Sequence, residues 1–143
     1  GQMKRAFYAC IFILIFIETA LNSNYPYYAI AVSFTGYLAY KKEYHAMIYA
    51  ALIGAVIGIS GSHLIRDISF FVMLVFVMIH VYKLFYFEKI NIIIISFIEC
   101  VIYVCYVYLF KINEVQIISW VKEFGFLVVY SYLFSSIDKN IGK

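Results

Sequence analysis

The chain has 143 residues, of which 66% are hydrophobic and 13% charged, with a formal net charge of +3. This composition is far from that of a soluble domain, so it excludes soluble enzymes, nucleic-acid binders and secreted disulfide-linked scaffolds. We predict an all-α integral membrane protein with a single domain over residues 3–143. Gly1 and Gln2 precede Met3, and we interpret them as a remnant of an expression vector.

Six apolar segments are predicted to cross the membrane as helices and to pack into a compact bundle. A spanning helix needs about 20 mostly apolar residues. The segments are Ala6–Leu21, Tyr27–Tyr40, Tyr44–Ser60, Ile68–Phe87, Ile90–Phe110 and Ile117–Ile137. The second is short, and its tyrosines are expected at the membrane interface. A β-barrel is not predicted, because runs such as INIIIISFIECVIYVCYVYLF do not alternate apolar and polar residues.

The basic residues between these segments predict the orientation, because cytoplasmic loops carry an excess of Lys and Arg. With the N-terminus inside, the inner connections hold Lys4, Arg5, Lys41, Lys42, Lys83, Lys89, Lys139 and Lys143. The outer connections then hold only Arg66, Lys111 and Lys122. We therefore predict a multi-pass protein with both termini in the cytoplasm.

Small residues recur at every fourth position around MIYAALIGAVIGISGS, residues 47–62. They are Ala46, Ala50, Gly54, Gly58 and Ser62. This spacing keeps them on one helix face, and such a face lets another helix backbone approach closely in lipid. The partner is either the second segment, which offers a notch at Ala29, Ser33 and Gly36, or another membrane protein. A phosphate-binding loop is excluded, because no lysine follows the glycines in the required register.

Among the ionisable residues in the predicted spans, where insertion is costly and a function is the default hypothesis, three stand out. They are Glu18, His80 and Glu99. Tyr103 and Tyr106 follow Glu99 at i+4 and i+7, so one face of the fifth segment carries a carboxyl and two phenols. Two interpretations stay open: a hydrogen-bonded cluster between helices, or a proton or cation relay with His80 as partner.

No catalytic or cofactor-binding pattern is found. Cys10, Cys100 and Cys105 lie within predicted spans, and no C-x-x-C motif or Cys/His cluster predicts a metal. The stretch SGSHLIRD holds the residue types of a catalytic triad, but so short a stretch carries them by chance. We expect a protein that is not an enzyme and has no cofactor or metal.

The stretch IETALNSNYPYYAIAVSFTGYLAYKKEYHAMIYAALIGAVIG resembles the start of the rod shape-determining protein MreD family. In that family a first span ends in a polar step, a proline opens the second span, and a third span with a glycine follows a basic turn. The matching positions here are Glu18-Thr19, Pro26, Lys41-Lys42 and Gly54. Four residues after Gly54 the family often has an aspartate, whereas this chain has Gly58.

The resemblance implies a non-enzymatic scaffold of the cell-elongation machinery, which builds peptidoglycan at the bacterial cytoplasmic membrane. It implies an MreC-like bitopic protein, an MreB-like filament and a RodA-type glycosyltransferase with its penicillin-binding transpeptidase as partners. The small-residue face of the third segment would then hold the single span of a partner.

Two other functions stay open. One is the S-component of an energy-coupling-factor vitamin transporter, which is similar in length and helix number. Its usual Ala-x-x-x-Ala motif is missing from the first segment, which has Ala6, Ala9 and Ala20. The other is a small proton- or cation-coupled carrier that uses Glu99 and His80.

Overall fold

The computed structural model is all-helical in the part of the chain that it describes. Its helices are α1 (Gln2–Leu21), α2 (Ala29–Lys41), α3 (Ala46–Gly61), α4 (Leu64–Leu84), α5 (Ile90–Phe110) and α6 (Ile117–Ile141). The structure describes residues 2–21, 28–41, 45–61, 63–84, 90–110 and 117–141, without the side chains of 2, 60, 61, 90, 91 and 138–141. The six predicted helical segments are therefore confirmed as helices.

Three of the helices are long and apolar enough to cross a membrane. These are the segments Leu64–Leu84, Ile92–Phe110 and Ile117–Ile137. The other three are more polar or shorter: α1 carries Lys4, Arg5 and Glu18, α2 has 13 residues and α3 has 16. At 1.5 Å per residue α2 is about 20 Å long, whereas the hydrocarbon core is about 30 Å thick. A membrane protein is thus supported, and crossing by α1, α2 and α3 stays a prediction.

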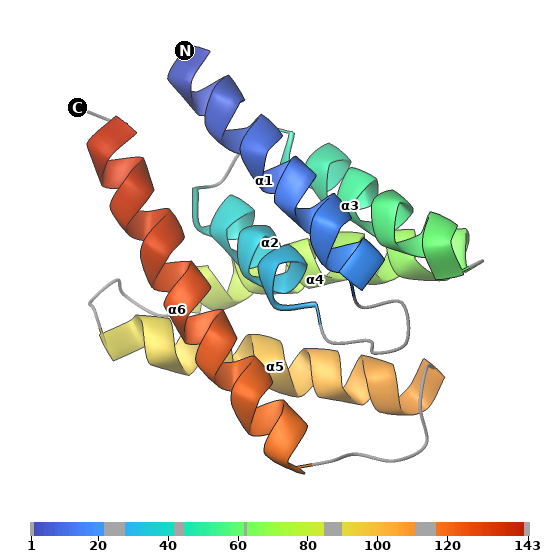
Figure 1. The fold of residues 1–143 in the computed structure, drawn as a ribbon. Helices are drawn as coiled ribbons and strands as arrows, with labels where there is room; N and C mark the ends of the chain where they lie inside the picture. Colours follow the sequence, from blue (N-terminus) through green and yellow to red (C-terminus); the bar gives the residue numbers. More distant parts are fainter. Residues whose placement is uncertain are drawn as a thin grey trace.

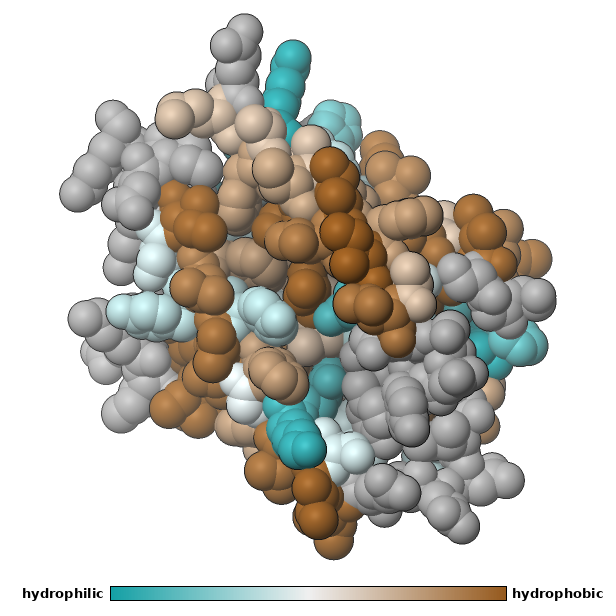
Figure 2. Space-filling model, viewed as in Figure 1, coloured by the Kyte–Doolittle hydropathy of each residue, from teal (hydrophilic) through white to brown (hydrophobic). Residues whose placement is uncertain are grey.

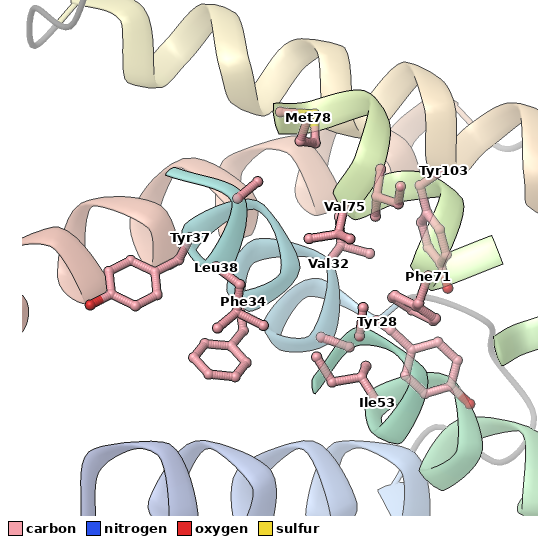
Figure 3. Close-up of a cluster of buried hydrophobic side chains, with 14 of the residues drawn as sticks. Tyr28, Val32, Phe34, Tyr37, Leu38, Ile53, Phe71, Val75, Met78 and Tyr103 are labelled. Atoms are coloured by element: carbon pink, nitrogen blue, oxygen red, sulfur yellow. The ribbon is translucent and has the colours of Figure 1, made fainter. Parts of the chain in front are cut away.

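The short helix α2 lies at the centre of the molecule, among α1, α3, α4 and α6 (Figure 1). Residues 31–39 are all buried, so no side of α2 reaches the surface there. A helix without a polar face fits such a position. Figure 3 shows Val32 of α2 pointing towards Val75 of α4 within the main hydrophobic cluster. The other helices form a shell that separates α2 from the surroundings.

The helices α3 and α4 pack backbone against backbone at the two glycines of α3. A Cβ atom on Gly54 would lie 2.6 Å from the Cα of Ile68, and one on Gly58 would lie 2.7 Å from the Cα of Leu64. Real Cβ atoms do not come so close, so glycine is what permits this contact. The small-residue face of α3 therefore lies against the first turns of α4.

The other small residues of that face that the structure describes also agree with close packing of α3. Ala46 and Ala50 are buried, and Ser62 lies outside the described residues. One expectation about this face is wrong. The notch of α2 receives α5 and α6 rather than α3: Gly36 faces Glu99 of α5, and the Ser33 Oγ donates to the Leu127 carbonyl of α6 at 3.5 Å.

The outer surface is strongly apolar. Figure 2 shows hydrophobic residues over much of one face, with hydrophilic residues in small groups between them. Large exposed side chains on α1 include Ile13, Phe16 and Ile17. A soluble monomer rarely exposes so large an apolar area, whereas lipid covers it at no cost. This surface agrees with a membrane location.

Candidate functional site

Glu18, near the end of α1, caps the first turn of α2. Its Oε2 accepts a hydrogen bond from the Ile30 N–H at 3.0 Å, and its Oε1 accepts one from the Ala31 N–H at 3.3 Å. The first N–H groups of a helix have no partner within the helix, and the helix dipole favours a negative charge there. Glu18 therefore joins the end of α1 to the start of α2.

Thr19 and Pro26 are the other residues of the first turn that match the family. The Thr19 Oγ1 donates to the Ile15 carbonyl at 2.8 Å, a bond within α1 itself. Pro26 lies outside the described residues. Of the two described residues, Glu18 thus bonds to another helix and Thr19 bonds within its own.

Glu99 of α5 lies in the middle of the bundle against Gly36 of α2. Its side chain is 1% exposed, and a Cβ on Gly36 would overlap the Glu99 carboxyl group. The Glu99 Oε2 has no hydrogen-bond partner. One turn earlier, Ser96 is 0% exposed and its Oγ also lacks a partner. Since residues three apart share a helix face, the hydroxyl and the carboxyl belong to the same buried face of α5.

The two tyrosines predicted on this face have different neighbours. Tyr103 is completely buried, and its hydroxyl bonds to the backbone of Tyr28, which directly precedes α2. Tyr106 instead donates to the Asp67 carboxylate in the first turn of α4. The predicted row of Glu99, Tyr103 and Tyr106 therefore divides between α2 and α4.

Arg66 completes the contact between α4 and α5. Its Nε donates to the Tyr106 hydroxyl at 3.2 Å, and its Nη1 donates to the Phe110 carbonyl at 3.1 Å. The Tyr106 ring also stacks on Phe70 with centroids 3.9 Å apart. The buried Asp67 was not predicted from the sequence, because it lies just before the fourth apolar segment and resembles a loop residue.

His80 is not the neighbour of Glu99 that the sequence suggests. It is exposed on α4, its Nδ1 lies 3.1 Å from the Phe76 carbonyl, and its ring packs on Phe76. Met78, two residues earlier on α4, is completely buried. Residues two apart on a helix point in nearly opposite directions, so His80 points away from the core of the bundle.

Glu123 of α6 is a second buried carboxyl, and sequence reasoning missed it. It is 3% exposed, and its Oε1 has no hydrogen-bond partner. Lys122 beside it is exposed, so the Lys-Glu pair resembles the polar end of a span. The signal that was available is a carboxyl nearly two turns inside the sixth apolar segment, between Trp120 and Phe124.

We name the three glutamates Glu18, Glu99 and Glu123 the carboxyl seam. Among the described residues no Lys, Arg or His is buried, so no basic side chain inside the bundle balances these carboxyls. Within that same part of the chain, no His, Cys, Asp and Glu residues group so as to hold a metal ion. A buried carboxyl is costly when ionised and unpaired. Protonation of a carboxyl removes this cost without any partner.

Figure 1 shows that α5 and α6 cross. Two apolar grooves are lined by residues of these two helices. The larger has a volume of about 460 Å³ and is lined by Phe97, Cys100, Val101, Val104, Cys105, Ile117, Trp120, Val121 and Phe124. The smaller has a volume of about 350 Å³ and is lined by Ile92, Ile93, Val128, Val129, Tyr132 and Leu133. Apolar side chains dominate both linings, which suits lipid tails or another transmembrane helix.

No protein-family model, curated protein or solved structure matches this chain. Its function is therefore inferred from its residues and their geometry.

Proposed function

We propose that this protein is a non-enzymatic membrane scaffold of the bacterial cell-elongation machinery, as its resemblance to the MreD family implies. The observation that carries the proposal is that the resembling residues hold the bundle together. Glu18 caps α2, and Gly54 brings α3 onto the backbone of α4. A bundle fixed in this way presents constant outer faces, which a scaffold needs in order to bind partner helices.

The proposed topology is six spans in the cytoplasmic membrane with both termini on the cytoplasmic side. One contact supports it: Phe7 near the start of α1 and Phe134 near the end of α6 have ring centroids 6.2 Å apart. The start of the first helix and the end of the last therefore lie at one end of the bundle. An MreB-like filament would approach from that end, where Lys4 and Arg5 lie in the first turns of α1.

The proposed docking surface is the larger groove between α5 and α6. The glycine face of α3 is covered by α4, so a partner helix cannot use it without separating the two. The groove is apolar and open, and it suits the single span of an MreC-like protein. A RodA-type glycosyltransferase with its penicillin-binding transpeptidase would contact the same assembly.

Filling the groove tests this surface. Cys105 lines it and is exposed, so Cys105→Trp places an indole where the partner helix would lie. We expect co-purification with an MreC-like partner in mild detergent to fall by about tenfold or more. Leu14→Trp is the matched control, since Leu14 is exposed on α1. Equal recovery with both variants would contradict docking in this groove.

The same preparation distinguishes the scaffold from the S-component. A vitamin retained through purification, or recovery of transporter ATPase subunits in place of an MreC-like protein, would favour the S-component and overturn the scaffold.

A further inference from the structure

Two exposed lysines lie where the ends of α2 and α4 meet. Lys41 is the last residue of α2, and Lys83 lies in the last turn of α4. The tyrosines that precede them join the two helices, because the rings of Tyr40 and Tyr82 have centroids 5.6 Å apart. We name Lys41 and Lys83 the lysine pair. Adjoining helix ends thus carry two positive charges at the surface.

The lysine pair belongs to the end of the bundle where α1 begins and α6 ends, which we call the termini end (Figure 1). Tyr37, one turn before Lys41, contacts Phe7 near the start of α1, and their ring centroids are 6.0 Å apart. Lys4 and Arg5 in the first turns of α1 add two more positive charges there. Basic residues from three helices therefore gather at the termini end.

The acidic side chains that the structure describes lie away from the termini end. They are Glu18 in the last turn of α1, Asp67 in the first turn of α4, Glu99 in the middle of α5 and Glu123 near the start of α6. In the sequence, the segments 41–45 and 83–89 each hold two lysines and one glutamate, so both keep a net positive charge. A positive potential at this end attracts anions.

The neighbours of the lysine pair favour a lipid headgroup over a small soluble anion. Leu84, next to Lys83, is 78% exposed, and Tyr40, next to Lys41, is 37% exposed. A surface that places apolar and aromatic side chains beside basic ones suits the membrane interface, where aromatic rings lie at the level of the headgroups. Basic clusters at that level bind anionic lipids.

We propose that the lysine pair binds the headgroup of an anionic phospholipid at the termini end of the bundle. The two ammonium groups bind the lipid phosphate from two helices, and Leu84 and Tyr40 contact the apolar part of the lipid next to it. A zwitterionic lipid binds less well, because its own positive charge lies beside the phosphate. This site does not depend on the scaffold function, since neither lysine lines the proposed docking groove.

Native mass spectrometry of the full-length protein tests the site. The protein is released from micelles that hold equal amounts of phosphatidylglycerol and phosphatidylcholine with the same acyl chains. We expect the wild type to retain phosphatidylglycerol preferentially. The double variant Lys41→Gln/Lys83→Gln should reduce this preference by about tenfold or more, because each basic residue near the surface strengthens the binding of anionic lipid about fivefold. Equal retention of the two lipids by the wild type overturns the proposal.

Two control variants separate this place from positive charge in general. Lys41→Arg/Lys83→Arg keeps both charges and should keep the preference. Lys122→Gln removes an exposed lysine near the start of α6 and should behave as the wild type. A glutamine double variant that keeps the preference, or an equal loss in Lys122→Gln, overturns the site.

Two further measurements distinguish lipid binding from other roles of these charges. A lysine in the last turn of a helix also stabilises the helix dipole, and that role alone would lower the melting temperature without changing the lipid preference. Excess inorganic phosphate should release no more phosphatidylglycerol than sodium chloride of the same ionic strength. Greater release by phosphate would overturn the lipid assignment in favour of a free anion.

Discussion

Glu18, Gly36 and Glu99 show how single residues decide the interior of this bundle. Glu18 accepts hydrogen bonds from two N–H groups in the first turn of another helix, where N–H groups have no partner within the helix. Because glycine has no side chain, Gly36 leaves room for the Glu99 carboxyl to lie against α2. Contacts with α2 thus place both of these carboxyls.

Removing the cap of α2 should destabilise the protein. Loss of a capping side chain costs about 0.5–2 kcal/mol, so Glu18→Ala should lower the melting temperature in detergent by a few degrees. Glu18→Gln keeps an acceptor oxygen for one N–H group and should lose less. Thermal unfolding followed by circular dichroism measures both variants. Equal melting temperatures for the wild type and Glu18→Ala would show that the cap has no role in stability.

A methyl group at Gly36 should be harmful, although alanine favours helices. The added Cβ would overlap the Glu99 carboxyl, which would have to shift although it is 1% exposed, and overpacking of this kind costs about 1–3 kcal/mol. Gly125 of α6 is the matched control, because nothing lies within 4 Å of its Cβ position. Gly125→Ala should be neutral or stabilise by up to about 1 kcal/mol. If the two variants melt alike, the close contact between α2 and Glu99 is wrong.

At the scale of the helices, the sequence predicted which segments form helices and roughly where each begins and ends. It did not predict which helices pack against one another. Long apolar runs fix where helices form, and the spacing of Gly54 and Gly58 correctly marked a face for close packing. That spacing does not say which helix occupies the face, because small residues fit any backbone. The pairing of α3 with α4, and of the α2 notch with α5 and α6, depends on contacts distant in the sequence.

The site was predicted only in part for a related reason. Glu99 stands out because it lies in the middle of an apolar run. Asp67 and Glu123 lie near segment ends, where charged residues are common, so only burial distinguishes them. His80 was a reasonable partner by position along α4, but its direction around the helix axis excludes it.

Substitution of Gly54 should separate α3 from α4. Gly54→Leu places its side chain against the backbone of Asp67 and Ile68, which cannot move aside as a flexible side chain would. We expect aggregation or a broad elution profile in size-exclusion chromatography. Gly125→Leu adds the same side chain at an open position and should elute as the wild type. A monodisperse Gly54→Leu protein would contradict the α3–α4 contact.

At the scale of the whole molecule, a short buried helix is enclosed by a shell of more apolar helices. The charged groups of the described interior are carboxyls, and basic residues lie at or near the surface. This distribution suits a rigid membrane bundle that binds other helices through its outside. It also keeps the carboxyl seam separate from the proposed docking groove.

The scaffold function is tested most directly by pull-down of the wild-type protein from native bacterial membranes in mild detergent, with the recovered proteins identified by mass spectrometry. The proposed function predicts recovery of an MreC-like bitopic protein, together with the RodA-type glycosyltransferase and its penicillin-binding transpeptidase. Recovery of transporter ATPase subunits, or of no membrane partner above a control pull-down, would contradict it.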